Sequence, residues 1–493
     1  MSTFDLGLAN RLHDGTGRSE FSSVKRNKTR SLTAQQGTPE DDTIRLYALN
    51  QPANDGDEIA ENQSPAELAD PVTSEGGLWG WIVVAGSTTI FFVVLGLVYS
   101  FGVMQSELLR RNYASSSTLG WVSSTTVVFM PLLAIPVTAS IKLTSNRTIA
   151  LLGALCTGFG YLATSFTFDK PVVYLFLAQS LFGMGYALTF WSCNSLAGQY
   201  FVRKRGVAVG IVYAGSGVGG AVFSIILSRL ITIVGLEVAV RIYGGIALGL
   251  LIPASFTLRS NKEVPVASFR LTYFKDLNFN LLILATALMT FSLFVPAFFL
   301  PSYAVAAGMS AETGAWLVAG FNLASAVGRI FFGFLADGRV GPLTSLCLAM
   351  LLMAISILSI WMASGGLLAP LICFLLINGA ASGALLSLQP PVLSSLYGVS
   401  AMSVTMAMVT MSRSLGSALG PAIAGYLLDV SSGGARAAEE ARKAAETYGR
   451  GAGLGTKPYL LPLGVMGAIS MIAALCLTIL RWRLAGLDLK KRV

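Results

Sequence analysis

Two arginines stand inside long apolar segments in the second half of the chain. Arg329 belongs to a segment from about residue 312 to 335, and Arg413 to another from about 401 to 428. A guanidinium at bilayer depth costs roughly 2.5–3.5 kcal/mol on insertion scales, so it must face a polar cavity or a partner. Its planar set of donors matches the two oxygens of a carboxylate. We therefore predict that Arg329 and Arg413 bind an anionic group of a small molecule.

A second interpretation of Arg329 is structural. This arginine lies toward the end of its apolar segment, and Asp337 follows it. In that case the guanidinium pairs with Asp337 or with helix carbonyls as part of a gate, because a buried charge needs a partner. For Arg413 the corresponding alternative is a purely structural arginine.

Five further polar or amphipathic residues fall within apolar segments and are predicted to line the same cavity. They are Tyr99, Asn194, Tyr303, Asn322 and Gln389. Each of them alone is also compatible with an ordinary hydrogen bond between two helices, which is common where polar side chains lie in a membrane. The sequence therefore proposes a set of candidates for a substrate-binding cavity.

The apolar segments lack the clusters of side chains that catalysis and metal binding require. The single histidine, His13, stands in the polar N-terminal region, and the five cysteines lie in apolar runs without paired spacing. Asp and Glu residues occur only near the edges of the segments. We therefore expect no enzyme, metal site, cofactor or disulfide framework.

The elements that position the arginines are predicted to be transmembrane helices. The chain is 54% hydrophobic and 12% charged, and it has no charged residue between Arg339 and Arg413. About 20 consecutive apolar residues cross a bilayer as a helix. The apolar runs lack the two-residue alternation of a membrane barrel, so the fold class is all-α.

The polar breaks divide the chain into twelve predicted spans. Their approximate bounds are 79–105, 118–141, 148–167, 172–198, 206–228, 240–258, 278–306, 312–335, 341–363, 367–392, 401–428 and 459–481. A longer hydrophilic link at 259–277 separates two bundles of six helices, 76–258 and 278–482. Two such halves joined by a cytosolic link are typical of secondary transporters with parallel repeats.

Weak internal similarity supports two pseudo-symmetric halves. The segment Gly215–Gly220, which reads GSGVGG, has a counterpart in Gly420–Gly425, which reads GPAIAG. The first segment also matches a dinucleotide-binding fingerprint, but it lies inside an apolar span and follows no strand. We expect these glycines to allow close packing of helices instead.

The polar ends of the chain are predicted to be cytosolic. Residues 1–75 are rich in Ser, Thr, Asn and Asp, a composition typical of disorder, and 483–493 form a basic tail. A basic patch from Lys25 to Arg30 either contacts anionic lipids or is simply solvated. The Lys and Arg residues of the short loops predict a multi-pass membrane protein with both termini in the cytosol. The expected location is the plasma membrane. The net charge of +9 therefore does not indicate nucleic-acid binding.

Two motifs carry a resemblance to a known family. Residues 75–81 read EGGLWGW, and residues 200–210 read YFVRKRGVAVG, followed by AGS at 214–216. Together they resemble the two signatures of the monocarboxylate transporter family, in its fungal branch, within the major facilitator superfamily. The resemblance covers about residues 75–485 and implies the major facilitator fold. It also implies a small-molecule carboxylate as the partner and alternating access as the mechanism.

The chain departs from the proton-coupled members of that family at two positions. Those members have a lysine late in span one and an aspartate four residues before the arginine of span eight, where this chain has Tyr99 and Ser325. The arginine, Arg329, is kept. The expected function is therefore facilitated diffusion of an organic anion. A proton-coupled symporter, an exporter of secondary metabolites and a receptor that does not transport are the alternatives.

A gate is predicted where span eight ends. Gly333-x-x-x-Asp337-x-Arg339 resembles a shortened form of the superfamily's cytosolic gate motif. The basic residues of the second signature, Arg203 and Arg205, are assigned to the same gate. Asp337 near a neighbouring helix end would stabilise one of two conformations.

Overall fold

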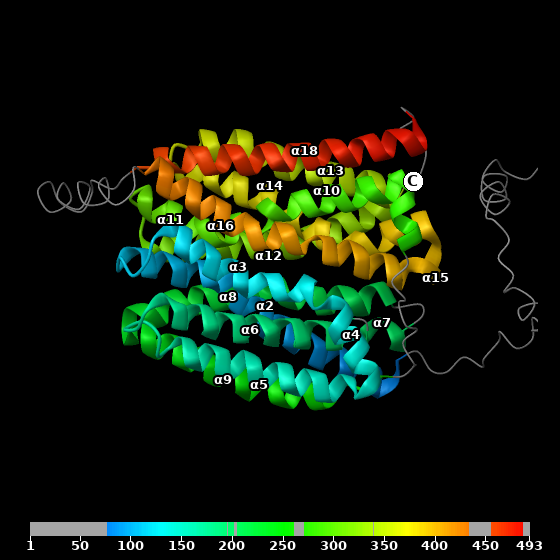
Figure 1. Ribbon diagram of the computed structural model, residues 1–493, viewed down its shortest axis with the longest axis horizontal. Helices are drawn as coiled ribbons and strands as arrows, with labels where there is room; N and C mark the ends of the chain where they lie inside the picture. The colour runs from blue at the N-terminus through cyan, green and yellow to red at the C-terminus, as the bar shows by residue number, and fades with distance from the viewer. Residues whose placement is uncertain are drawn as a thin grey trace, which may run out of the picture. The chain divides into compact units, whose positions relative to one another are not determined.

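The computed structural model describes residues 76–194, 196–201, 205–260, 271–338, 340–432 and 455–486, and these residues form helices joined by short turns (Figure 1). Their bounds are α2 (Gly77–Arg110), α3 (Ser116–Leu132), α4 (Ala134–Leu143), α5 (Asn146–Thr164), α6 (Val172–Cys193), α7 (Ala197–Tyr200), α8 (Arg205–Val234), α9 (Leu236–Thr257), η2 (Leu271–Lys275), α10 (Leu277–Leu293), α11 (Val295–Ala306), α12 (Ala311–Asp337), α13 (Pro342–Ile355), η3 (Ser356–Trp361), α14 (Leu368–Ser387), α15 (Gln389–Ser412), α16 (Ser414–Ser431), η4 (Lys457–Tyr459) and α18 (Leu460–Ala485). The predicted all-α class is confirmed. The predicted tail 1–75, most of the link 259–277 and residues 487–493 lie outside the described residues.

Each of the twelve predicted spans falls on one helix or on two consecutive helices. In the described part of the chain, nine helices are long and apolar enough to cross a membrane, or ten if the bent pair α3 and α4 is one span. The other two predicted spans correspond to α5 and to the α15–α16 region. Many large apolar side chains are exposed on the outer surface, as expected for helices that face lipid.

Several spans are broken near their middle. The chain bends by 52° between α3 and α4. Further interruptions stand at Phe294, Leu388 and Arg413, each of which separates two consecutive helices. Prolines in and beside the breaks explain part of this pattern, because proline removes a backbone donor and clashes with the preceding turn. Interrupted helices place irregular backbone and polar side chains inside the membrane.

The tenth span is longer than the sequence predicted. The predicted span ended near residue 392, but the chain stays helical to Tyr397 and turns at Gly398, whose φ is 79°. Pro390 and Pro391 stand in the first turn of α15, where a missing backbone N–H costs little. Gly398 supplies the left-handed backbone conformation that this turn requires.

The first six and last six spans meet along several pairs of helices, among them α2 and α11. Helix α8 packs against α12, and α3 packs against α16. Gly217 and Gly220 of α8 lie against Ala326 and Asn322 of α12, so close that an added Cβ would lie 2.7 Å and 2.6 Å from them. Gly425 of α16 similarly approaches the carbonyl of Ser116 at the start of α3. The predicted role of these glycines in close packing is confirmed.

The two sequence signatures meet in space. The rings of Trp81, at the start of α2, and Phe201, which follows α7, lie 5.0 Å apart in an edge-to-face arrangement. Gly80 leaves room for Tyr200 and for the ring of Phe201. The Tyr200 hydroxyl donates to the carbonyl of Arg259 at 2.8 Å. These signature residues therefore fix the start of the first span to the turn between spans four and five.

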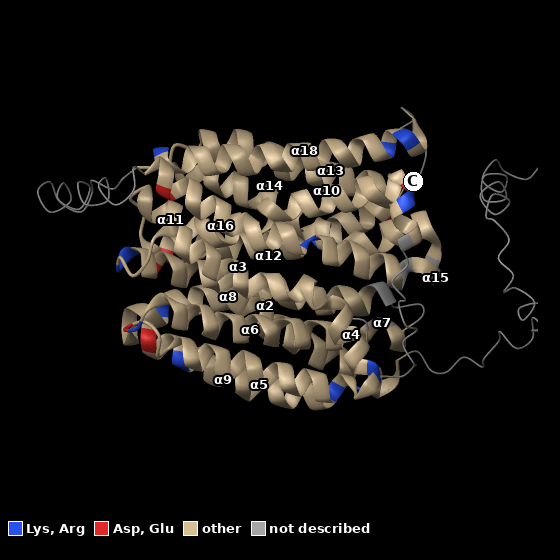
Figure 2. Ribbon diagram, in the orientation of Figure 1, with Lys and Arg blue, Asp and Glu red and all other residues tan. Residues whose placement is uncertain are grey.

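Charged residues gather at the two ends of the helices, and the wide band between them is almost free of charge, with a blue segment near α12 as an exception (Figure 2). One end, called the linker end below, contains the turn before α5, the end of α9 and the turn at Gly398. The other, called the far end, contains the turn between α2 and α3, the start of α12 and the end of α16. This distribution is the one that a bilayer imposes on a membrane protein.

Candidate functional site

A narrow cavity of about 30 Å³ lies between the two sets of six helices. From the first set its lining residues are Leu95, Tyr99, Met130, Tyr186, Phe190, Trp191, Asn194 and Tyr213, and from the second they are Phe294, Arg329, Leu386, Gln389, Met406, Thr410 and Arg413. Three of the second group, Phe294, Gln389 and Arg413, stand at or beside helix breaks. The breaks therefore help to form the cavity wall.

Arg413 is 4% exposed and is held by neutral groups. Its Nε donates to Oγ1 of Thr290, and its Nη1 donates to Oε1 of Gln389, both at 3.2 Å. Because guanidinium has only donors, the oxygen of the Gln389 amide must face it. The amide nitrogen of Gln389 is left buried and has no hydrogen-bond partner among the described residues.

Arg329 is 7% exposed and bridges the two halves. Its Nη1 donates to Oγ of Ser216 and to the carbonyl oxygen of Tyr213, both on α8 and both at 2.5 Å. The guanidinium also lies over the ring of Tyr213, 5.6 Å from its centre. Its contact with a helix carbonyl agrees with the gate interpretation, and its place on the cavity wall agrees with the anion-binding interpretation.

The two arginines have no carboxylate within ion-pair distance in the part of the chain that the structure describes. The acidic residues of that part stand near helix ends. They are Glu107, Asp169, Glu237, Asp276, Glu312, Asp337 and Asp429. The cavity wall therefore keeps an uncompensated positive charge, which an anionic ligand would neutralise.

Tyr99 and Asn194 also lie on the cavity wall, as the sequence predicted. Asn194 accepts a hydrogen bond of 2.6 Å from the hydroxyl of Tyr213. Gln389 is the third predicted polar residue on this wall. Five of the seven predicted substrate-binding residues, including both arginines, are thus brought together.

The other two predicted binding residues lie elsewhere. Asn322 of α12 is buried against Gly220 of α8, beside Tyr99. Its amide nitrogen donates to the carbonyl of Val318 at 3.0 Å. Tyr303 belongs to an aromatic cluster with Trp361 and Tyr459, and its hydroxyl lies 2.7 Å from that of Ser364.

The predicted gating residues are only partly within the described chain. Asp337 is the last residue of α12. Arg205 begins α8, but its side chain lies outside what the structure describes, as do Arg203 and Arg339 altogether. The gate assigned to these four residues stays a prediction.

At the far end, polar contacts join the two halves. The carboxylate of Asp429, at the end of α16, accepts hydrogen bonds from the backbone amides of Ser116 at 3.0 Å and Ser117 at 2.7 Å. These amides belong to the first turn of α3, whose donors are otherwise without helix partners. Arg229 and Glu312 form a second contact of 2.6 Å between the halves. This end is therefore closed by groups that must separate if the halves move apart.

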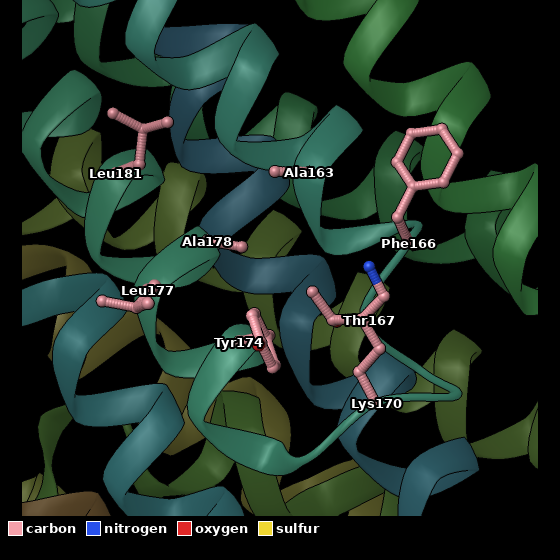
Figure 3. A pocket seen from close by; sticks show the side chains of 8 residues that line it. All are labelled: Ala163, Phe166, Thr167, Lys170, Tyr174, Leu177, Ala178 and Leu181. Carbon is pink, nitrogen blue, oxygen red and sulfur yellow. The ribbon is translucent and has the colours of Figure 1, made fainter.

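A larger hollow, about 410 Å³, lies away from this cavity, between α5 and α6 (Figure 3). Its lining is mostly apolar and includes the exposed side chains of Phe166, Tyr174 and Leu177, with Lys170 at one edge. None of the predicted site residues belongs to it. Because exposed apolar side chains on such helices face lipid, size alone does not make this hollow the substrate site.

Several residues of the cavity wall were not predicted from the sequence. Tyr186, Phe190 and Trp191 lie close together in α6, and Tyr213 precedes the second signature's Ala-Gly-Ser by one residue. Aromatic residues in apolar spans usually pack in the core, so their spacing gave no separate signal. Thr410 could have been predicted from the sequence, because it stands three residues before Arg413 and positions three apart share a helix face.

Comparison with known proteins identifies the family. The model of the Major Facilitator Superfamily matches residues 80–311 and 281–491. The MFS-type transporter opdF of Penicillium oxalicum is 30% identical over 76% of this chain and 88% of its own length. The aspyridones efflux protein apdF of Emericella nidulans is 30% identical over 72% of this chain and 73% of its own length. Monocarboxylate transporter 11 of Mus musculus is 28% identical over 73% of this chain and 83% of its own length.

Solved structures agree in fold. A bacterial homologue of the human lysosomal transporter Spinster aligns with a TM-score of 0.63 at 17% identity, over 82% of this chain and 97% of that one. The nucleoside transporter NupG aligns with a TM-score of 0.64 at 10% identity, over 81% of this chain and 99% of that one. These structures confirm the predicted major facilitator fold. The relatives named above confirm the resemblance carried by the two signatures. The chain belongs to the Major Facilitator Superfamily of membrane transporters.

Proposed function

We propose that this transporter carries a small organic anion by alternating access of its two halves around the central cavity. The observation that carries the proposal is the pair of buried arginines, Arg329 and Arg413, on one cavity wall without an acidic partner among the described residues. A buried charge of this kind is costly unless a ligand neutralises it. A carboxylate fits the guanidinium geometry.

The size of the cavity supports a cycle with moving halves. A volume of about 30 Å³ holds about two water molecules, too little for a ring-bearing organic acid. Binding therefore requires the halves to separate. The cavity lies where they meet, and the far-end contacts are two hydrogen bonds to Asp429 and one ion pair of Glu312, which a rocking motion can break.

Facilitated diffusion is the proposed form of transport. Proton relays in membranes commonly use Asp, Glu or His, and the described residues around the cavity include none of these. Tyr99 and Ser325 stand where proton-coupled relatives have Lys and Asp. An arginine keeps its proton under physiological conditions and cannot replace them as a carrier.

Export of a fungal secondary metabolite is a second candidate. It is favoured by the likeness to the aspyridones efflux protein of Emericella nidulans. Import and export differ in the direction of the gradient, and both use the same cavity. A receptor without transport activity finds no support among the transporters named above.

We also propose that the linker end faces the cytosol and that the protein resides in the plasma membrane. Basic residues lie at or beside helix termini of the linker end, in agreement with their excess on the cytosolic side of membrane proteins; they are Lys142, Arg147, Arg259 and Lys275. Epitope tags at the two termini should be inaccessible to antibody in intact cells and accessible after permeabilisation. Staining of intact cells would contradict this orientation.

Transport by the purified, full-length protein in lipid vesicles tests the function. Labelled lactate, benzoate and indole-3-acetate would be offered at about pH 7.5, where carboxylates are ionised. At least one should enter faster than into protein-free vesicles, and Arg413→Ala should reduce that rate roughly tenfold or more. Equal entry of all three into protein-containing and protein-free vesicles would contradict the proposed substrate class.

A further inference from the structure

The two walls of the central cavity differ in chemistry. The first half contributes aromatic rings and no charge, whereas both arginines belong to the second half. The aromatic wall is formed by Tyr99, Tyr186, Phe190, Trp191 and Tyr213, and the polar wall by Arg329, Gln389, Thr410 and Arg413. A ligand that satisfies both walls must itself have two different sides.

The polar wall holds two unused hydrogen-bonding groups beside Arg413. Nε2 of Gln389 and Oγ1 of Thr410 are buried without a partner among the described residues, and these side chains are 2% and 3% exposed. A buried donor without a partner is costly, so such groups usually indicate a ligand or a water. Both groups can donate, and together with Arg413 they form a donor set suited to a carboxylate.

The aromatic wall is held rigidly. Nε1 of Trp191 donates to the carbonyl of Met130 at 2.7 Å, which fixes the indole. Phe190 packs on Trp191 at 5.5 Å between ring centres and stacks on Phe91 at 5.0 Å. Preformed aromatic surfaces of this kind favour flat apolar groups, because little side-chain entropy is lost on contact.

We propose that the substrate is an organic acid with a flat, apolar, ring-bearing body. Its carboxylate binds Arg413, Gln389 Nε2 and Thr410 Oγ1, and its body lies against Phe190, Trp191 and Tyr213. This inference rests on the proposed function and narrows its substrate class. A two- or three-carbon acid would satisfy the donors but leave the aromatic wall in contact with water, at a loss of apolar burial.

Ligand-dependent thermal stability of the purified, full-length protein tests the proposal without transport. The probes are indole-3-acetate, indole-3-acetamide and acetate, of which the second lacks the charge and the third lacks the ring. Indole-3-acetate should bind at least tenfold more tightly than either. Equal affinity for acetate would contradict the role of the aromatic wall, and equal affinity for the amide would contradict the role of the donor set.

A substitution at Thr410 separates ligand binding from folding. Thr410→Val keeps the shape of the side chain and removes a hydroxyl that has no partner among the described residues. The melting temperature without ligand should be unchanged or higher, while the affinity for indole-3-acetate falls severalfold. Thr478→Val, on α18 outside the cavity, is the matched control and should leave affinity unchanged. Unchanged affinity in Thr410→Val would contradict the assigned donor set.

Phe190→Leu tests the other wall. This substitution keeps an apolar side chain but removes the ring, so affinity for indole-3-acetate should fall severalfold and affinity for acetate should not change. Equal losses for the two acids would contradict the assigned orientation. If lactate is transported while indole-3-acetate neither binds nor enters, this inference fails and the proposed function stands. If no carboxylate binds or is transported, both fail.

Discussion

Arg413 donates to Oε1 of Gln389 at 3.2 Å, and this contact turns the Gln389 amide nitrogen to a position without a partner in the described chain. Arg413 stands at the break between α15 and α16, and Gln389 follows the break before α15. Both side chains line the central cavity. Two interrupted helices thus produce a positive, donor-rich wall in an apolar body. Replacing the amide nitrogen of Gln389 by oxygen would place a carboxylate beside Arg413 and neutralise the positive charge of the site.

Arg329→Ala should leave the protein folded but reduce organic-anion transport. The variant loses a charged donor on the cavity wall, which is worth about 1.5–3 kcal/mol, or roughly ten- to a hundredfold. Arg329→Lys should restore transport only in part, because lysine keeps the positive charge but lacks the planar set of guanidinium donors that matches a carboxylate. Vesicle uptake normalised to the amount of inserted protein measures this effect. Near wild-type uptake in the alanine variant would show that Arg329 is structural.

Gly217→Leu should prevent the halves from packing correctly. An added Cβ would lie 2.7 Å from Ala326 and 2.8 Å from the Asn322 carbonyl, so α8 and α12 would have to separate. Overpacking of this kind costs about 1–3 kcal/mol or more. Gly249→Leu is the matched control, because nothing lies within 4 Å of the position that its Cβ would take. Size-exclusion chromatography and melting temperature should distinguish the variants, and equal behaviour would contradict the packing role.

Asp429→Ala should loosen the far end. The carboxylate holds the first-turn amides of α3 across the two halves, whereas the Arg229–Glu312 pair is exposed and contributes little. Hydrogen exchange in α11 (Val295–Ala306), which packs against α2, should speed up severalfold in this variant. Glu312→Gln should change that rate by less than about twofold. Unchanged exchange in Asp429→Ala would mean that this contact does not hold the far end closed.

Whether net charge moves together with the substrate tests the proposed facilitated diffusion. An anion that crosses alone carries current, whereas symport with one proton is electrically silent. We therefore expect vesicles on a solid-supported membrane to give a current when a transported carboxylate is applied. An imposed pH gradient should have little effect on flux, since the described cavity wall has no Asp, Glu or His. Uphill accumulation driven by an inward proton gradient and abolished by a protonophore would contradict uniport.

The helices and the two arginines were predictable because their signals are strong and local. An apolar run of membrane length has few alternative structures, and an arginine inside such a run needs a polar environment wherever it occurs. The same reasoning found Gln389 and Asn194. The glycines of α8 were also predictable, because small residues repeated in an apolar span allow backbones to approach.

Other parts of the site depend on tertiary arrangement. Trp191 and Tyr303 are both aromatic residues in apolar spans, yet Trp191 faces the cavity and Tyr303 packs on Trp361 and Tyr459. Sequence spacing does not distinguish these environments, because the neighbours come from distant parts of the chain. The continuation of the tenth span to Tyr397 was missed for a local reason, since prolines in a first helical turn do not end a helix.

Gln389→Glu gives the most direct test of the account, because it changes one atom and converts the Arg413 contact into an ion pair. An internal carboxylate on Arg413 would occupy the place of the substrate's anionic group and repel it. Uptake of the best-transported labelled carboxylate into vesicles should fall more than tenfold in this variant, with the melting temperature unchanged or higher. Uptake at the wild-type rate by a folded Gln389→Glu protein would contradict the claim that the positive charge of Arg413 binds the substrate.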